Sequence, residues 1–264
     1  MTFASRFGRP IFGMVHLAAL PGAPTFGGSM DAVIDAALAD ACALREGGCD
    51  GMIFENFGDR PFFKERVEAA TVAAMTRVIA EVVREVVLPF GVNVLRNDAM
   101  SAVAIAAATG GAFIRVNVHT GAMLTDQGII EGRAAETLRL RASLAPHVLI
   151  FADHMVKHAT PLVEIDEEQA AKDLQQRGRA DAIIVSGRET GAEPDRQRFA
   201  RVRAAVDAPL LVGSGLTEAN VDAFADADGA IAGTSIKRDG RVEAPVDAAR
   251  VARLAAAFRA RGGR

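Results

Sequence analysis

The chain has 264 residues, a formal charge of −3, 50% hydrophobic residues and 24% charged residues, values that fit a globular domain with a large core and exclude a disordered chain. Aromatic residues contribute only 5%, without Trp or Tyr, and no basic excess accompanies them, which excludes a nucleic-acid-binding role. The length is close to that of one eight-fold α/β barrel, so we expect residues 1–264 to form a single domain.

The first residues lack a basic segment followed by an apolar run and a cleavage site, so no signal peptide is expected. The most apolar stretch, 79–94, is interrupted by charged residues, Pro89 and Gly91, and predicts no transmembrane segment. We therefore expect a cytoplasmic protein. Cys42 and Cys49 are interpreted as reduced thiols rather than as a disulfide or a metal site. The oligomeric state stays open, a homo-oligomer included.

Eight short apolar runs recur along the chain with helical patterns between them. They cover residues 11–17, 51–55, 90–95, 113–117, 148–152, 182–186, 209–213 and 229–233. Their nearly continuous apolar character is typical of parallel strands buried on both faces. Eight strand–helix units, with no G-x-G-x-x-G turn after the first strand, favour an α/β fold of the closed (β/α)8 TIM barrel type over an open Rossmann-like sheet.

Helices are expected between these strands. Apolar residues repeat at helical spacing over 33–44 and again over 67–86. Side chains suited to N-capping stand before several of the helical patterns. The expected caps are Ser29 or Asp31, Asp98, Asp166 and Thr217.

Polar residues end most of the strands, and a (β/α)8 barrel builds its active site at the carboxyl ends of its strands. Glu55 and Asp153 are candidate proton donors or acceptors, because partial burial at a barrel mouth moves a carboxyl pKa toward neutrality. The alternatives are a structural ion pair of Glu55 with Arg115 or Lys157, and a loop-capping role for Asp153.

Two basic side chains complete the catalytic candidates. His16, late in the first strand, could move a proton or donate to an oxyanion, or simply pack. Lys157 and His158 are adjacent, so on an extended segment they would point to opposite sides, with Lys157 toward the pocket. Schiff-base chemistry would require a desolvated Lys157 and a carbonyl substrate; the alternative is a charge that orients an anion. Further candidate substrate contacts are Asn93, Arg115, Asn117, His158, Ser186 and Gly187.

The segment 118–128 is long for a connection between a strand and a helix. It is interpreted either as a lid that brings Asp126 and Gln127 over a substrate or as an ordinary surface loop. The spacing of the histidines predicts no multi-histidine metal site. Glu55 and Asp153 beside a phosphate are a candidate pair for Mg²⁺, and no other cofactor is expected.

Two glycine turns follow the last two strands, Gly213-Ser214-Gly215 and Gly233-Thr234-Ser235. Loops at these positions often form the phosphate site of such barrels, because glycine lets the backbone approach phosphate oxygens closely. The hydroxyls of the two turns add hydrogen-bond donors, and Lys237 adds a positive charge. The turns therefore predict a phosphorylated small molecule as the ligand.

Several strings resemble the BtpA/SgcQ family over nearly the whole chain. They include Gly13-Met14-Val15-His16-Leu17, Glu55-Asn56-Phe57-Gly58-Asp59, Asn93-Val94-Leu95-Arg96-Asn97-Asp98, Thr125-Asp126-Gln127-Gly128, and Ser186-Gly187 with Thr190-Gly191. The resemblance implies a barrel of the ribulose-phosphate-binding kind, in a family with one branch named for photosystem I biogenesis and another placed among nucleosidases or sugar-metabolism proteins. His154 stands where a small aliphatic residue is expected after Asp153, which raises the question of whether it tunes specificity.

Two hypotheses about function follow. The first is an enzyme that acts on a phosphorylated sugar or nucleotide-like compound by acid/base chemistry, as a nucleosidase-type glycosidic-bond hydrolase or as a sugar-phosphate isomerase or lyase. The second is a non-catalytic biogenesis or assembly factor that retains the barrel. The density of polar groups at the strand ends favours the enzyme.

Overall fold

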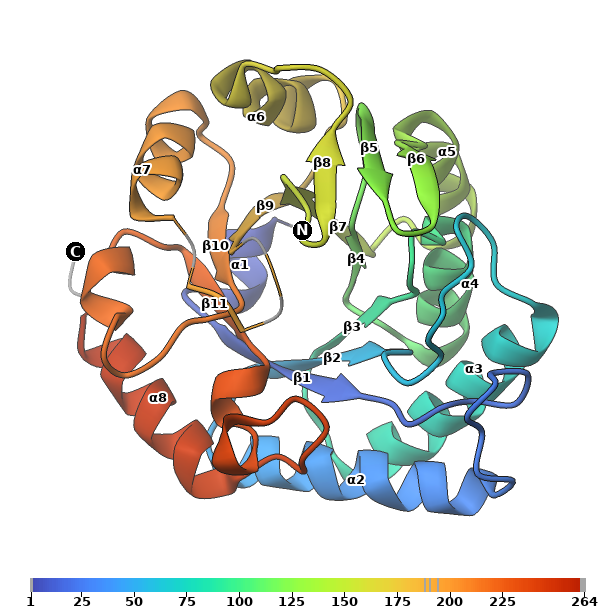
Figure 1. Cartoon of the computed structure of the whole chain (residues 1–264). Coiled ribbons are helices and arrows are strands. Elements are labelled where there is room, and N and C mark those ends of the chain that lie inside the picture. Colours follow the sequence, from blue (N-terminus) through green and yellow to red (C-terminus); the bar gives the residue numbers. More distant parts are fainter. Residues whose placement is uncertain (1, 188, 190, 194, 262–264) are drawn as a thin grey trace.

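Eight parallel strands close into a barrel in the computed structural model, which describes residues 2–187, 189, 191–193 and 195–261. Around the barrel the order is β1, β11, β10, β9, β7, β4, β3 and β2 (Figure 1). The bounds are β1 Ile11–His16, β2 Gly51–Glu55, β3 Phe90–Asn93, β4 Phe113–Val116, β7 Leu149–His154, β9 Ala182–Ser186, β10 Leu210–Gly213 and β11 Gly229–Ala232. The predicted (β/α)8 barrel is confirmed, and every predicted run contains or overlaps one strand.

Helices surround the barrel (Figure 1). They are α2 Met30–Glu46, α3 Ala69–Glu85, α4 Ala99–Thr109, α5 Ala134–Leu144, α6 Glu167–Gln176, α7 Arg196–Ala205 and α8 Ala248–Ala260. Ser29, Asp98 and Asp166 cap α2, α4 and α6 as predicted, each accepting a hydrogen bond from a backbone N–H in the first turn.

The prediction of a helix after Thr217 is wrong. The chain there forms only a short 3-10 turn, η1 Val221–Phe224. Asn220 explains the difference, because its side chain accepts a hydrogen bond from Thr217 N at 2.8 Å and donates one to Gly215 O at 2.8 Å. These two bonds close the segment into a tight turn before a helix can start.

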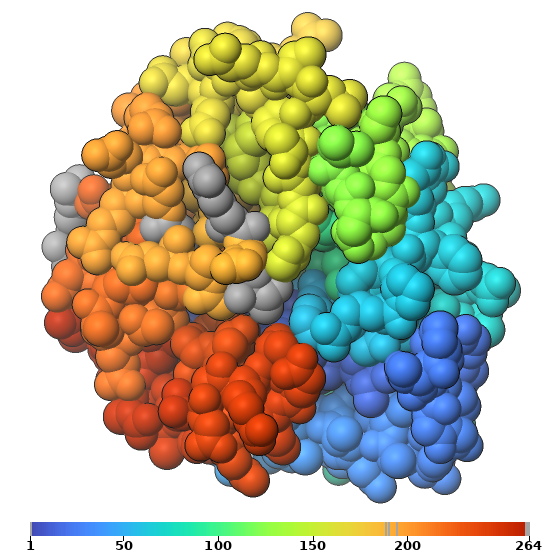
Figure 2. All heavy atoms as spheres, viewed as in Figure 1, coloured from blue at the N-terminus to red at the C-terminus, as the bar shows by residue number. Residues whose placement is uncertain are grey.

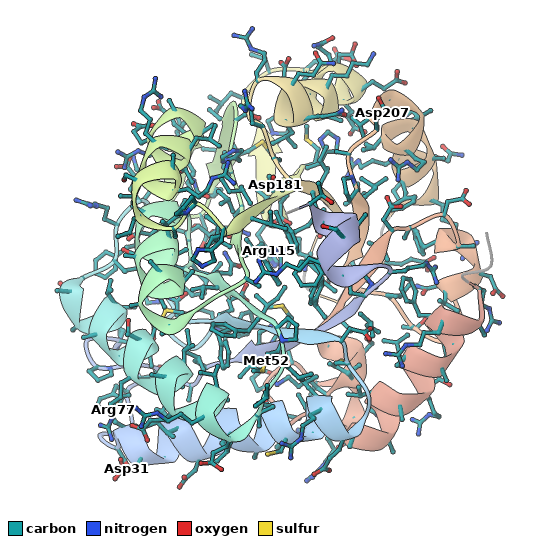
Figure 3. All side chains as sticks on the ribbon, turned by 180° about the vertical axis from the view of Figure 1, so that it is seen from behind. Asp31, Met52, Arg77, Arg115, Asp181 and Asp207 are labelled. Carbon is teal, nitrogen blue, oxygen red and sulfur yellow. The ribbon has the colours of Figure 1, made fainter. Side chains whose placement is uncertain are left out.

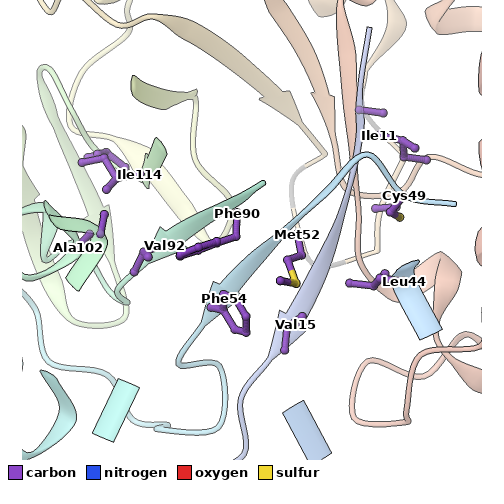
Figure 4. Close-up of a cluster of buried hydrophobic side chains, with 14 of the residues drawn as sticks. Ile11, Val15, Leu44, Cys49, Met52, Phe54, Phe90, Val92, Ala102 and Ile114 are labelled. Atoms are coloured by element: carbon purple, nitrogen blue, oxygen red, sulfur yellow. The ribbon is translucent and has the colours of Figure 1, made fainter. Parts of the chain in front are cut away.

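Two apolar layers support the barrel. One lies between the strands and the surrounding helices, and Val15, Phe54 and Leu44 belong to it (Figure 4). The other fills the barrel interior around Phe113 and Phe151, whose rings stack at 4.1 Å. Successive side chains of a strand point to opposite faces, so each strand contributes to both layers.

A short helix, α1 Phe3–Phe7, closes the end of the barrel where the strands begin (Figure 3). Phe3 packs 5.5 Å from Phe151, and Phe7 meets Phe12 edge to face at 5.2 Å. This end of the barrel is therefore sealed with aromatic rings, which leaves the opposite end for chemistry.

The segment predicted as a lid or a loop is a hairpin. Strands β5 Ala122–Thr125 and β6 Gly128–Glu131 pair with each other, and β5 also pairs with β8 Ala159–Pro161, in a small antiparallel sheet. A small core separate from that of the barrel joins Met123 and Ile130 of the hairpin to Val118 and Val156 of neighbouring segments. Burial of these side chains orders a stretch that looks like a loop in the sequence.

No helix in the described ranges is long and apolar enough to cross a membrane. Cys42 and Cys49 are both free thiols, and burial raises the pKa of Cys49 to about 12. A thiol with this pKa stays protonated at neutral pH, which fits the structural role predicted for it.

Candidate active site

A cavity of about 750 Å³ lies where the barrel strands end. A hollow is visible near the centre of the same face (Figure 2). Strand ends, the hairpin tip and the loops after β2, β3 and β7 all contribute to its wall. The lining residues are Met14, His16, Glu55, Phe57, Arg60, Pro61, Phe62, Leu95, Arg96, Arg115, Asn117, Asp126, Gln127, Val156, Lys157, His158, Ser214, Ile231, Gly233, Thr234 and Val242.

The strand alternation delivers the polar side chains to this cavity. On β2, Ile53 belongs to the apolar barrel interior, and Glu55 is two residues further along the same face. On β4, Phe113 and Arg115 repeat this arrangement. The uppermost layer of the barrel interior is therefore polar, while the layers beneath it are apolar.

Glu55 is a buried carboxylic acid in the cavity wall. It is 6% exposed, and its Oε1 lies 3.7 Å from Nε2 of His16. Burial raises the pKa of Glu55, although the charges of Arg115 and Lys157 oppose the shift. Such a group exchanges a proton closer to neutral pH than an exposed glutamate does, as a general acid or base requires. The alternative ion pairs of Glu55 with Arg115 or Lys157 are not formed.

His16 lies beside Glu55 and is neutral at physiological pH. Its ring stacks on Phe57 with the centroids 4.5 Å apart. Burial, together with the positive charges of Lys237 and Lys157, lowers the pKa of His16 to about 3. A neutral imidazole is suited to hydrogen bonding with substrate rather than to carrying a positive charge.

Asp153 holds Arg115 in place. Its carboxylate accepts hydrogen bonds from Nε of Arg115 at 3.2 Å and from Nη2 of Arg115 at 3.1 Å to each oxygen, and another from Nδ2 of Asn117 at 2.9 Å. Asn93 donates to Oδ1 of Asn117 at 3.0 Å and to the backbone oxygen of Arg115 at 3.1 Å. Arg115 and Asn117 line the cavity, whereas Asp153 and Asn93 lie behind them. Asp153 therefore anchors Arg115 and Asn117 in this structure, and its predicted part in proton transfer stays a prediction.

Lys157 and His158 both line the cavity, so the expectation that they point to opposite sides is wrong. The segment is bent rather than extended, with Met155 and His158 at φ of 53° and 52°. Arg96 donates a hydrogen bond to the backbone oxygen of Lys157 and holds this bend. Burial and the charge of Arg115 lower the pKa of Lys157 to about 8.

The two glycine turns reach the cavity beside His16, because a Cβ on Gly233 would lie 3.6 Å from Cε1 of His16. Ser214, Gly233 and Thr234 line it, and the buried Oγ1 of Thr234 has no hydrogen-bond partner among the described residues. Gly213, Gly215 and Ser235 do not belong to the lining. A Cβ on Gly215 would lie 2.0 Å from the backbone oxygen of Ala192, so this glycine makes room for the loop after β9.

Four other predicted residues lie outside the cavity. Ser186 is buried against Gly213, Gly187 packs on the backbone of Ala192, and Thr190 falls outside the described residues. Lys237 is bound to Asp40, with Nζ 2.6 Å from Oδ2, and its ammonium is therefore engaged away from any phosphate. His154 is buried among α6 and α7 residues, where the charges of Glu167 and Arg198 act on it, so it does not contact the cavity.

The hairpin tip brings Asp126 and Gln127 into the cavity wall, as the lid interpretation requires. Among the described lining residues, Arg60, Arg96, Arg115 and Lys157 are basic, whereas Glu55 and Asp126 are acidic. Arg115 is paired with Asp153 and Arg60 with Glu243, so Arg96 and Lys157 are the lining cations outside these two pairs, and positive groups in a concave, partly buried site attract an anionic ligand.

Sequence reasoning missed Phe57, Arg60 and Phe62 as candidates. They come from the loop after β2, and the Arg60 guanidinium lies 4.8 Å from the Phe57 ring centre. In the sequence, the feature that could have indicated these residues is the length of that loop, which runs from the end of β2 to the start of α3.

The carboxylates are not arranged as a metal site. Both oxygens of Asp153 accept hydrogen bonds from Arg115 or Asn117, so Asp153 is not a free Mg²⁺ ligand beside Glu55. No cluster of three or more His, Cys, Asp or Glu side chains suited to a metal occurs in the part of the chain that the structure describes.

Comparison with known sequences identifies relatives along nearly the full chain. A model of the BtpA family matches residues 8–260. The photosystem I biogenesis protein BtpA of Synechocystis is 47% identical over 244 residues, which cover 92% of this chain and 85% of that protein. The sgc region protein SgcQ of Escherichia coli is 35% identical over 251 residues, which cover 93% and 92% of the two chains.

Comparison with solved structures supports the fold. A chain of Mycobacterium tuberculosis tryptophan synthase superposes with a TM-score of 0.61 at 18% identity, covering 97% of this chain and 94% of that one. At this identity the likeness extends to the barrel architecture alone.

Proposed function

The chain belongs to the BtpA family, and on that premise we propose that it is an enzyme that acts on a phosphorylated sugar or nucleotide-like compound by acid/base chemistry. The observation that carries the proposal is the buried Glu55 carboxyl in the wall of a cavity that Arg96, Arg115 and Lys157 also line. A surface used only for assembly does not require a desolvated acid inside a barrel.

The phosphate is proposed to bind at Ser214, Gly233 and Thr234. The Thr234 hydroxyl supports this placement, because it is buried, unpartnered and part of a cavity-lining turn. A buried hydroxyl without a partner loses free energy that a ligand oxygen would restore. A Cβ on Gly233 would lie 3.5 Å from Met14, so a larger side chain there would narrow the cavity.

The reacting part of the substrate then lies toward Glu55, and His16 lies between Glu55 and the Gly233 turn. Glu55 gives a proton to a leaving oxygen or takes one from water or from carbon, and neutral His16 donates a hydrogen bond beside it. Arg115, held by Asp153, stabilises negative charge that develops on the substrate. These roles suit either hydrolysis of a glycosidic bond or isomerisation and cleavage of a sugar phosphate.

The alternative is a biogenesis or assembly factor. It is favoured only by the name of the Synechocystis relative, a photosystem I biogenesis protein. A factor of this kind would bind a protein partner regardless of the Glu55 side chain. Copurification of a stoichiometric protein partner, retained by Glu55→Gln, would support the factor over the enzyme.

A ligand panel tests the proposed enzyme. Purified protein is incubated with inorganic phosphate, ribose 5-phosphate, ribulose 5-phosphate and ribonucleoside monophosphates, and both thermal shift and turnover are measured. We expect Thr234→Val to weaken phosphate binding at least several-fold, and Glu55→Gln to retain binding but lose about 100-fold or more of the turnover. Glu131→Gln, at an exposed position of β6, serves as the matched control. If no member of the panel binds or reacts, the proposal is wrong.

A further inference from the structure

Lys157 is distinct from the other lysines of this chain. The chain contains four lysines, Lys64, Lys157, Lys172 and Lys237. Lys64 pairs with Glu65 at the surface, Lys237 is bound to Asp40, and Lys172 lies on the outer helix α6. Lys157 lines the cavity, and none of the ion pairs found among the described residues includes it.

The surroundings of Lys157 combine burial with like charge. Arg115 and Arg96 are the cations that act on its ammonium, and Glu55 and Asp153 are the acids that oppose them. Arg115 and Asp153 are bound to each other, so their opposite charges largely offset one another at Lys157, and burial is the main cause that lowers its pKa. Desolvation beside other cations is how an amine is kept neutral for attack on a carbonyl carbon.

From this juxtaposition we infer that Lys157 is a nucleophile that forms an imine with the carbonyl group of a phosphorylated open-chain sugar or keto compound. The inference rests on the proposed function and narrows it to substrates that carry a carbonyl. It also favours the isomerase or lyase reactions over glycosidic-bond hydrolysis, because hydrolysis of a glycosidic bond requires no amine nucleophile.

The chemistry balances with the groups present in the cavity. The lone pair of Lys157 Nζ adds to the carbonyl carbon, the carbonyl oxygen takes up a proton, and nitrogen loses one, which gives a carbinolamine. The hydroxyl of the carbinolamine then leaves as water with a proton from Glu55, so that amine and carbonyl become a protonated imine and water. The imine draws electrons from the adjacent C–H or C–C bond, and the Glu55 carboxylate accepts the proton released.

The cavity can hold both ends of such a molecule. Lys157 and Glu55 line the same cavity as Ser214, Gly233 and Thr234, where the phosphate is proposed to bind. Arg96 fixes the backbone of Lys157 through its carbonyl oxygen, which limits the positions that the amine can take. A cavity lined by an amine and by groups that bind phosphate selects a substrate that carries both a carbonyl and a phosphate.

Borohydride trapping tests the inference. The full chain is incubated separately with pyridoxal 5′-phosphate, ribose 5-phosphate, ribulose 5-phosphate and dihydroxyacetone phosphate, reduced with sodium borohydride, and analysed by intact mass and peptide mapping. We expect one adduct at Lys157 with pyridoxal phosphate and with at least one sugar phosphate. Excess inorganic phosphate should reduce the labelling at least several-fold.

The variants separate nucleophilicity from charge. Lys157→Arg keeps the positive charge and should lose all of this adduct while still binding inorganic phosphate in a thermal-shift assay. Lys172→Arg is the matched control and should label as the parent does. A folded Lys157→Arg variant with the same labelling as the parent, or labelling only of Lys64 or Lys172, would overturn the inference.

The outcomes also separate this inference from the proposed function. If the sugar phosphates bind and Glu55→Gln abolishes their turnover, yet no Lys157 adduct forms with any carbonyl probe, the imine is wrong and the enzyme stands. If pyridoxal phosphate labels Lys157 but no sugar phosphate binds or forms an adduct, a sugar phosphate is the wrong substrate in both the proposed function and this inference.

Discussion

Among single residues, Glu55 has a consequence for stability that depends on pH. Burial raises its pKa in the folded protein, so the folded state keeps a proton at pH values where the unfolded chain has released it. Stability must therefore fall as pH rises from the ordinary glutamate range to the raised pKa. Replacement by glutamine removes this loss.

We expect Glu55→Gln to gain stability relative to the parent as pH rises from 4 to 8, with the unfolding free energy measured in urea at several pH values. Exposed Glu131→Gln should follow the parent at each pH. A Glu55→Gln effect that is constant with pH would show that the carboxyl is not perturbed.

The Arg115–Asp153 pair supports a second prediction. Its side chains are 7% and 1% exposed, and Asp153→Asn leaves the guanidinium without its counter-ion. Loss of one partner of a buried pair costs about 3–5 kcal/mol. We expect Asp153→Asn to lower the unfolding free energy toward that range, as measured by urea denaturation, because hydration from the cavity offsets part of the cost.

The control for this change is an exposed ion pair. Glu218 lies 3.1 Å from Arg253, with both side chains about half exposed. Glu218→Gln should change the unfolding free energy by about 1 kcal/mol or less. If both variants lost the same small amount, Asp153 would not be the anchor of Arg115.

The hydrogen-bond partners of Asp153 could not be predicted from the spacing of residues in the sequence. It stands where a catalytic carboxylate is expected, at the end of β7. Its partners Arg115 and Asn117 are more than 30 residues earlier, and only the pairing of β4 with β7 brings them together. A carboxylate that anchors a cation and one that transfers protons look alike in a sequence.

At the scale of elements, the barrel strands were predictable because both of their faces are buried. Residues 182–185, for example, are apolar without interruption, and with Ser186 they form β9. The hairpin was not predictable in the same way, because β5 and β6 have four residues each and their support comes from Val118 and Val156 outside the hairpin. Thr217 carries a normal capping signal, which the side chain of Asn220 overrides.

The separate core of the hairpin predicts separate stability. Ile130 is buried in the hairpin core, whereas Ile105 of α4 is buried in the layer between helices and barrel. Ile105→Ala should lower the global unfolding free energy by about 2–5 kcal/mol. Ile130→Ala should instead speed hydrogen exchange at the β5 and β6 amides and weaken ligand binding, with a smaller global loss. Equal global losses, without faster local exchange, would mean that the hairpin unfolds only with the barrel.

At the scale of the whole molecule, the barrel separates stability from chemistry along its axis. Helix α1 lies at one end of the barrel (Figures 1 and 3). Its residues Phe3 and Phe7 seal that end, and the cavity lies at the other. The apolar barrel interior lies between them. In this fold, side chains at the end where strands begin serve stability, and those at the other end serve function.

Two phenylalanines at the opposite ends test this separation. Phe3 is 3% exposed and packs on Phe151, so Phe3→Ala should lower the unfolding free energy by about 3–5 kcal/mol. Phe62 is half-buried in the cavity wall, so Phe62→Ala should lose less stability but weaken binding of a sugar phosphate several-fold. Urea denaturation gives the unfolding free energy of each variant, and ligand titration gives its affinity for the sugar phosphate. Because the rigid interior lies between the two positions, Phe3→Ala should leave ligand affinity within about two-fold of the parent at a temperature where it is folded. A Phe3→Ala variant that is folded yet binds ligand as poorly as Phe62→Ala would mean that the two ends of the barrel are coupled.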